Sequence, residues 1–123
     1  KDNKIFKKNY KFNHKARNLI KDSIYSISEF NKKTISKYRI VANPGCYSTS
    51  VLLPLIPLIK KNYINKNNIT IDAKSGFSGA GKNLKKKFNH KNIFSSTFAY
   101  SVKNHRHMCE IDQEIYDKTK KKN

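Results

Sequence analysis

One cysteine lies between a sharp turn and a long apolar segment. Cys46 comes directly after Asn43-Pro44-Gly45, and before a segment that we expect to be a largely buried helix over residues 47 to 61. The unsatisfied N–H groups and the dipole at a helix N-terminus stabilise an anion, so this placement favours a thiolate. A thiolate can attack an acyl carbon while the same N–H groups hold the oxyanion that forms. A buried structural cysteine is the alternative interpretation.

Two histidines flank an arginine towards the C-terminal end. In an extended backbone His105 and His107 would point to one side and Arg106 to the other. Either imidazole can act as an acid and a base, although a lone histidine also serves as a surface or core residue. No convincing third ligand lies nearby in the sequence, so we predict no metal site.

Three of the four glycines fall in one loop, which reads Ser75-Gly76-Phe77-Ser78-Gly79-Ala80-Gly81 and is followed by Lys82. The loop has neither the Rossmann fingerprint nor the Walker A pattern. Its small residues and N–H groups beside a lysine suit a phosphate, on a cofactor or on a substrate. A plain flexible loop is the alternative.

Short elements are expected to position these residues. Residues 37 to 42 favour a strand that leads into the Cys46 turn, and Ile69 to Ala73 alternates like a strand that leads into the glycine-rich loop. Phe94 to Val102 is predicted to form a further strand that ends near His105. Glu110 to Lys118 should be an exposed helix with acids first and lysines last. One of the two prolines within residues 47 to 61 should kink or break that helix.

Length and composition limit the fold. A chain of 123 residues can bury one modest core, and 37% hydrophobic residues exclude a wholly disordered chain. The longest apolar run, Val51 to Ile59, is far shorter than the roughly 20 residues that span a bilayer, so we expect no membrane partner. Two cysteines without C-x-x-C spacing indicate reduced thiols and a cytoplasmic location. The start at Lys1 is interpreted as truncation or processing.

The formal net charge of +19 raises the possibility of a nucleic-acid-binding module. Only three of the 27 basic residues are arginines, the residue type that base reading and bidentate phosphate contacts favour. The lysines are spread along the chain beside abundant asparagine and isoleucine, as a compositional bias would produce. We therefore predict no specific nucleic-acid partner.

Three segments, in this order, resemble N-acetyl-gamma-glutamyl-phosphate reductases. They are Val41-Ala42-Asn43-Pro44-Gly45-Cys46-Tyr47-Ser48-Thr49, then Thr70-Ile71-Asp72-Ala73-Lys74-Ser75-Gly76-Phe77-Ser78-Gly79-Ala80-Gly81, then His105-Arg106-His107 with Glu110-Ile111. The resemblance extends from about Tyr25 to Glu114. It implies reductive dephosphorylation of N-acetylglutamyl 5-phosphate by NADPH, which gives the semialdehyde in arginine biosynthesis.

The resemblance also implies roles for individual residues. Cys46 would carry a thioacyl intermediate, and His105 or His107 would move protons at the thiol and the hemithioacetal, with His105 preferred. NADPH and phosphate would meet the loop residues Ser75, Gly76, Ser78, Gly79, Ala80 and Gly81. The acyl phosphate would be bound by Lys82, Tyr100, Arg106 and Glu110.

Several positions depart from the family pattern. Ser26 and Ser28 replace a glycine and a proline, Ser48 stands where proline is common, and Pro54 interrupts the helix behind the nucleophile. Met108 and Cys109 replace a threonine and a proline after the histidines, which adds a second thiol.

The resemblance implies an α/β fold in two parts. Residues 1–42 would be the tail of a Rossmann-type NAD(P)-binding domain, and residues 43–123 would open an α+β catalytic and dimerisation domain with a mixed sheet. No glycine precedes Gly45, so the dinucleotide fingerprint is missing from the chain. We expect the complete protein to be a homo-oligomer and this chain alone to be inactive.

Alternatives remain at this stage. An aspartate-semialdehyde dehydrogenase, or a reductase of a carrier-linked glutamyl phosphate, would use the same thioacyl chemistry on another substrate. A basic nucleic-acid-binding fragment, or a decayed product that keeps the motif without the activity, would be non-catalytic.

Overall fold

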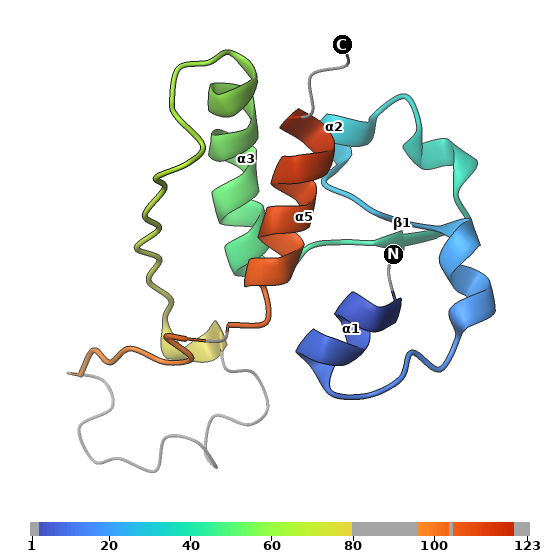
Figure 1. Ribbon diagram of the computed structural model, residues 1–123, viewed down its shortest axis with the longest axis horizontal. Helices are drawn as coiled ribbons and strands as arrows, with labels where there is room; N and C mark the ends of the chain where they lie inside the picture. The colour runs from blue at the N-terminus through green and yellow to red at the C-terminus, as the bar shows by residue number, and fades with distance from the viewer. Residues whose placement is uncertain (1–2, 80–95, 104, 120–123) are drawn as a thin grey trace. The chain divides into compact units, whose positions relative to one another are not determined.

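The computed structural model describes residues 3–79, 96–103 and 105–119, and the chain divides into two units. Unit 1 comprises Lys1–Ile69 and His105–Asn123, and unit 2 comprises Thr70–Asn104. The described residues of unit 2 contain a short 3-10 turn over residues 77–79 and no strand. The helices and strands named below all belong to unit 1 (Figure 1).

Unit 1 combines helices with a small sheet. Its elements are, in chain order, α1 (Asn3–Tyr10), the 3-10 helix η1 (Arg17–Asp22), β1 (Ser23–Tyr25), α2 (Ser28–Asn31), the 3-10 helix η2 (Ile35–Lys37), β2 (Ile40–Ala42), α3 (Cys46–Lys60) and α5 (Met108–Thr119). This content agrees with the predicted α/β class.

The sheet is a parallel pair, in which Ser23 lies opposite Ile40 and Tyr25 lies opposite Ala42. Parallel strands need a crossover of about a dozen residues or more, and residues 26–39 supply it through α2 and η2. The predicted strand over residues 37–42 is confirmed in its second half. Because both strands point the same way, Tyr25 and the Cys46 turn come at the same edge of the sheet.

Helix α3 begins at Cys46 and continues through both prolines to Lys60, so the predicted helix is confirmed without a break. It ends in a Schellman motif. Asn62 adopts the left-handed conformation with φ 57°, its N–H bonds the Ile59 carbonyl, and the Tyr63 N–H bonds the Leu58 carbonyl at 2.9 Å. Asparagine tolerates this conformation, which explains a stop at this position.

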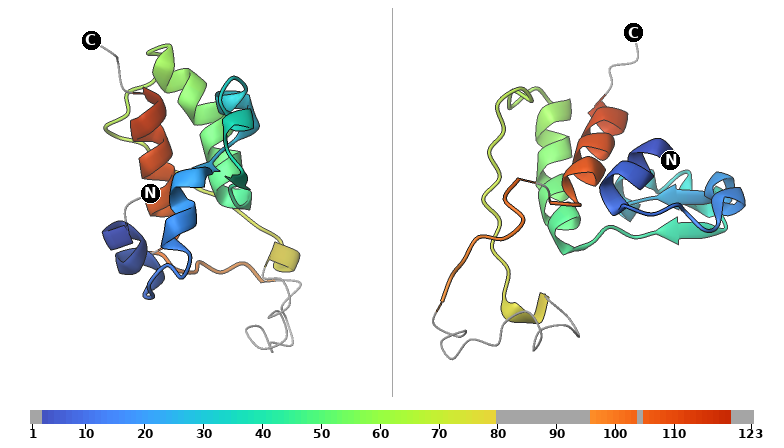
Figure 2. Two further views of the ribbon diagram at one scale, coloured as in Figure 1. Left: turned by 90° about the vertical axis from the view of Figure 1, so that its right-hand side faces the viewer. Right: turned by 60° about the horizontal axis from the view of Figure 1, so that its bottom comes forward.

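The core of unit 1 lies between α3 and α5, which run side by side (Figures 1 and 2). Ile27, Leu52 and Ile56 form its buried centre, and Ile111 and Ile115 of α5 pack against it. Lys118, near the end of α5, donates a hydrogen bond to Asn31 of α2. None of the helices in the described parts of the chain is long and apolar enough to cross a membrane.

Two predicted strands are wrong, and one helix differs in its surroundings. Among the described residues, Ile69 to Ala73 has no strand partner, and neither has the described part of Phe94 to Val102. Strand alternation was present in both segments, but a strand also needs a neighbour to pair with. The helix predicted over Glu110 to Lys118 exists, but Glu114 is buried and Ile111 and Ile115 are partly buried against the core, so it is not an exposed helix.

The predicted domain boundary between residues 42 and 43 stays a prediction, as do the mixed sheet and the Rossmann-type tail. Unit 1 contains residues from both sides of that boundary.

Candidate active site

Cys46 is the first residue of α3, and its side chain is exposed. Gly45 is the N-cap and has no side chain to accept a hydrogen bond from the first turn, so no side-chain cap is formed. The first amide groups of a helix have no partners within the helix and carry its positive end. The predicted arrangement of an accessible thiol at a helix N-terminus is therefore present.

His107 lies against the turn that precedes Cys46. A β-carbon added to Gly45 would lie 3.2 Å from Cε1 and 3.3 Å from Nε2 of the His107 imidazole. Only a residue without a β-carbon lets the ring come so close at ordinary contact distances. Gly45 thus brings one of the two candidate acid–base groups to the nucleophile's turn.

The rings of the two histidines are 4.8 Å apart between centroids, in an edge-on arrangement. Tyr47, the second residue of α3, has its ring 5.6 Å from the His105 ring, also edge-on. The backbone N–H of His107 donates to His105 Nδ1 at 3.3 Å, because the segment is turned before α5 and is not extended. The two imidazoles lie side by side, as predicted, but a turn brings them together and not the extended backbone that we expected.

The carboxylate of Glu110 accepts hydrogen bonds from three hydroxyl groups. Tyr10 at the end of α1 donates to Oε1, Tyr25 at the end of β1 donates to Oε2 at 2.7 Å, and Ser48 of α3 donates to Oε2 at 3.1 Å. Ser48 is fully buried. One carboxylate of α5 therefore contacts three separate elements.

The hydrogen bonds around Glu110 determine which of these groups are protonated. Burial alone would raise the pKa of Glu110, but the donors Tyr10, Tyr25 and Ser48, helped by His107, lower the pKa below its ordinary value. Burial, and then the hydrogen bond to Glu110, raise the pKa of both tyrosines above the ordinary range. Glu110 is thus ionised and both hydroxyls keep their protons at neutral pH.

Burial lowers the pKa of His107, Glu110 offsets part of this effect, and His105 and Arg106 lower the pKa further. Its Nδ1 is buried and has no hydrogen-bond partner among the described residues. The neutral imidazole that results at neutral pH can accept a proton.

The second thiol is held in its protonated form. Burial, followed by the charge of Glu110, raises the pKa of Cys109, and its Sγ donates to the Arg106 carbonyl at 3.1 Å. Both cysteines are free, and no disulfide joins them.

The other predicted residues are not all brought to this site. Arg106 is exposed in unit 1. Ser75, Gly76, Ser78, Gly79 and Tyr100 belong to unit 2, where the Gly79 N–H bonds the Gly76 carbonyl at 3.1 Å and Tyr100 is exposed. Ala80, Gly81 and Lys82 lie outside the described residues.

Sequence reasoning missed Gly45, Tyr10, Tyr25 and Ser48 as parts of the site. Gly45 could have been suspected, because the turn before a nucleophile is a place where side chains must approach the backbone. The tyrosines gave no signal, since they are 100 and 85 positions away from Glu110.

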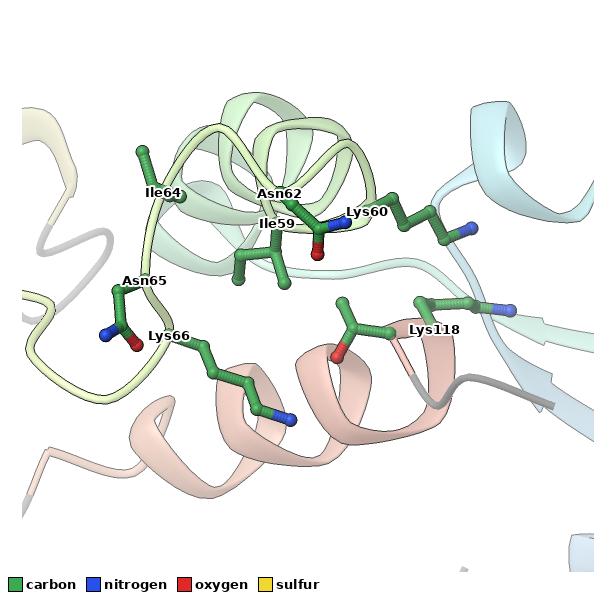
Figure 3. Close-up of a pocket in the computed structure, with 8 residues that line it drawn as sticks. Ile59, Lys60, Asn62, Ile64, Asn65, Lys66 and Lys118 are labelled. Atoms are coloured by element: carbon green, nitrogen blue, oxygen red, sulfur yellow. The ribbon is translucent and has the colours of Figure 1, made fainter. Parts of the chain in front are cut away.

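A cavity of about 750 Å³ opens at the C-terminal ends of α3 and α5 (Figure 3). Ile59, Ile64 and three lysines, Lys60, Lys66 and Lys118, are among the residues that line it. None of the candidate reaction groups lines it, so it is separate from the Cys46 turn.

Comparison with known proteins gives a family match. A family model described as "Semialdehyde dehydrogenase, dimerisation domain" matches residues 46–123. The match begins at the cysteine that opens α3.

Curated relatives extend the match towards the N-terminus. The N-acetyl-gamma-glutamyl-phosphate reductase of Halothermothrix orenii is 44% identical over 115 residues, which are 94% of this chain and 33% of that protein. The enzyme of the same name from Clostridium novyi is 43% identical over 115 residues, with the same coverage. A protein of Arabidopsis thaliana named probable N-acetyl-gamma-glutamyl-phosphate reductase, chloroplastic, is 47% identical over 104 residues, or 85% of this chain and 26% of that protein. The chain spans about a third or less of the length of these relatives.

Proposed function

Because the chain belongs to the semialdehyde dehydrogenase family, through the dimerisation domain matched over residues 46–123, we propose that it is the cysteine-bearing part of an N-acetyl-gamma-glutamyl-phosphate reductase. The observation that carries the proposal is the exposed thiol of Cys46 at the start of α3, with the His107 imidazole packed against the preceding glycine. Relatives of that name match over 93–94% of this chain in two bacterial cases.

The reaction proceeds through a thioester on Cys46. A histidine takes the proton of the thiol, and the thiolate attacks the acyl carbon of N-acetylglutamyl 5-phosphate, so that a C–S bond forms and the bond to phosphate breaks. The amides of the first turn of α3 hold the oxyanion during attack. After hydride transfer to the thioester carbon, the hemithioacetal breaks down to the semialdehyde, and the histidine returns a proton to the sulfur.

His107 is the better placed of the two histidines for this role. Its imidazole lies against Gly45, and burial keeps it neutral, as a base must be before it takes a proton. The sequence favoured His105 slightly. In the structure His105 uses Nδ1 to accept the backbone N–H of His107, which suits a residue that holds its neighbour in place.

NADPH is the proposed reductant and supplies the hydride when bound. The backbone of Gly76 is open to an approaching molecule, because a β-carbon added to it would meet nothing within 4 Å among the described residues. Gly79 has a different reason to be a glycine, since a β-carbon there would lie 2.5 Å from Ser75 Oγ. Ser75 and Ser78 remain proposed cofactor contacts, together with Ala80 and Gly81.

Lys82, Tyr100 and Arg106 remain proposed contacts to the acyl phosphate. Glu110 was predicted as a fourth, but in the structure both of its carboxylate oxygens already accept hydrogen bonds from the protein's own hydroxyls. The dimerisation domain supports a homo-oligomer for the complete protein. The cytoplasm stays the predicted location, although two plant relatives are named as chloroplastic.

The test uses the longer protein that contains this chain. We expect NADPH-dependent turnover of N-acetylglutamyl 5-phosphate well above turnover of aspartyl phosphate or a carrier-linked glutamyl phosphate. Cys46→Ser should lower kcat by at least about 1,000-fold, because it removes the only group that forms the thioester. The matched control is Cys109→Ser, which should keep turnover within about 2-fold, since that thiol is held protonated and faces the Arg106 carbonyl.

Turnover that survives Cys46→Ser would contradict the thioester mechanism. A preference for aspartyl phosphate would move the protein to the aspartate-semialdehyde branch of the family. The 123-residue chain alone should show no turnover, because it has no dinucleotide fingerprint.

A further inference from the structure

Glu110 lies near His107, the proposed proton-transfer group. It follows His107, the residue just before α5, by three positions, and its charge acts on the His107 imidazole. The Ile111 N–H bonds the His107 carbonyl at 3.0 Å, which ties His107 into the first turn of the same helix. The backbone of His107 is therefore held together with the start of α5.

Three elements contact the start of α5 through the carboxylate of Glu110. The hydroxyls of Tyr10, Tyr25 and Ser48 come from the ends of α1 and β1 and from the first turn of α3, and together they use both oxygens of Glu110. A carboxylate that accepts from several fixed donors has little freedom to turn.

We propose that Tyr10 and Tyr25 are positioning residues, whose hydroxyls fix the Glu110 carboxylate and thereby hold the His107 imidazole against the Gly45–Cys46 turn. This inference rests on the proposed function for its catalytic consequence. Its structural part, the placement of His107 by two distant hydroxyls, does not depend on which substrate is reduced.

The aromatic surroundings of Tyr10 support a fixed hydroxyl. The Tyr10 ring stacks on Phe6 with centroids 4.7 Å apart, and Phe6 is met edge-on by Phe12 and His14. Such pairs orient rings as well as burying them. Tyr25 is the last residue of β1, and its backbone is fixed by pairing with Ala42 of β2.

The charges around Glu110 determine what its loss would do. Tyr10 and Tyr25 face it from α1 and β1, and Ser48 faces it from α3. On α5 and the turn before it, the charge of Glu110 acts to raise the pKa of His107 and of Cys109, and Glu114 acts on Tyr25.

Arg106 acts on both Tyr10 and His107, His105 also acts on His107, and Asp112 acts on Cys109. The ionised Glu110 favours the protonated form of His107, against burial. If the carboxylate is neutralised or released, His107 should become harder to protonate.

The experiment measures His107 directly in the longer protein that contains this chain. Histidine ring signals are followed by NMR across pH in the wild type, Tyr10→Phe, Tyr25→Phe and Glu110→Gln, with the His107 signal assigned from a His107→Asn variant. The matched control is Tyr63→Phe, which deletes a hydroxyl from a ring that is 69% exposed.

We expect the His107 titration midpoint to move to lower pH in Glu110→Gln, and to lie between that value and the wild-type value in each of the two tyrosine variants. Tyr63→Phe should leave it unchanged. In steady-state kinetics, kcat should fall by about 10-fold in Tyr25→Phe while KM stays within about 2-fold, because the hydroxyl acts on the reacting group and not on binding.

A His107 midpoint and a kcat in both tyrosine variants equal to those of Tyr63→Phe would overturn the inference. Each phenylalanine keeps its ring, so the variants should fold, and circular dichroism checks this. If the wild-type protein shows no reductase turnover, the proposed function fails, while the NMR midpoints still decide whether the hydroxyls position His107.

Discussion

Replacing Gly45 by alanine should lower the rate of the proposed reaction while changing the stability of the fold only slightly. The backbone of Gly45, at φ −70° and ψ 174°, is extended and suits any residue, so alanine brings no backbone strain. Its new β-carbon, however, would lie 3.2 Å from His107 Cε1 and 3.3 Å from Nε2. Carbon atoms prefer about 3.5–4.0 Å, so the imidazole must withdraw by about half an ångström.

That displacement sets the expected size of the effect. A misplacement of about 1 Å at a reacting group can cost about 100-fold, so half of it should lower kcat/KM by about 10-fold. Alanine in an allowed backbone conformation stabilises by about 0.4–1 kcal/mol, but alanine is a poorer N-cap than glycine by a similar amount, and moving a side chain off its rotamer costs about 0.5–1.5 kcal/mol. The net change in unfolding free energy should therefore stay within about 1 kcal/mol.

The assay pairs reductase kinetics with urea unfolding for Gly45→Ala, His107→Ala and the double variant. Once the imidazole is gone, the added methyl group meets nothing from it, so Gly45→Ala should destabilise the His107→Ala protein by about 0.5–1.5 kcal/mol less than it destabilises the wild type. The reasoning is refuted if Gly45→Ala leaves kcat/KM unchanged, or if its effect on unfolding is the same with and without the imidazole.

Two further predictions concern the fold. Leu52→Ala should lower the unfolding free energy by about 3 kcal/mol, because Leu52 is fully buried between α3 and α5. The control is Leu58→Ala in the same helix, which should cost less than about 1 kcal/mol because the Leu58 side chain is 38% exposed. Equal losses in urea titrations would contradict the core described above. At alkaline pH the raised pKa values of Tyr10 and Tyr25 mean that the folded state keeps protons which the unfolded state releases above about pH 10, so stability present below that pH should fall as pH rises further. Replacing both tyrosines by phenylalanine should flatten this fall in unfolding measurements from pH 9 upwards, and an unchanged slope would argue against the hydroxyl network.

The nucleophile's surroundings were the part that the sequence could predict. A strand, a Pro-Gly turn, a cysteine and then an apolar helix are neighbours in the chain, so local preferences decide their order in space. The two prolines raised an expectation of a kink or break, yet α3 runs through both. Burial of Leu52 and Ile56 against α5 stabilises the helix more than two missing donors weaken it.

The sequence could not predict the elements whose structure depends on a partner far away in the chain. Ile69 to Ala73 alternates as a strand does, but within the described residues nothing pairs with it. Glu110 to Lys118 looked exposed because charged residues dominate it, although Ile111 and Ile115 lie four positions apart and form a narrow apolar stripe. The stripe was visible in the sequence, but the surface that covers it was not.

The same reasoning explains why the hydroxyls around Glu110 gave no sequence signal. A single hydrogen bond between residues 85 or 100 positions apart leaves no period and no motif, because neither partner needs a particular neighbour. Tyrosine, serine and glutamate are ordinary residues at ordinary places. Their relation appears only when the parallel strands and α1 bring the ends of three elements to one place.

The proposed site extends beyond the segment that the family model matches. The family match begins at Cys46, and residues 46–123 alone carry the thiol, both histidines and Glu110. Three of the groups that place them, Tyr10, Tyr25 and Gly45, precede that point, and the strand that leads into the turn precedes it as well. A segment that starts at Cys46 would keep every proposed reacting group, but Ser48 would be the remaining donor to the half-buried Glu110 carboxylate. Because that carboxylate would lose two of its three hydroxyl donors, the residues before Cys46 belong to the proposed site as much as those after it.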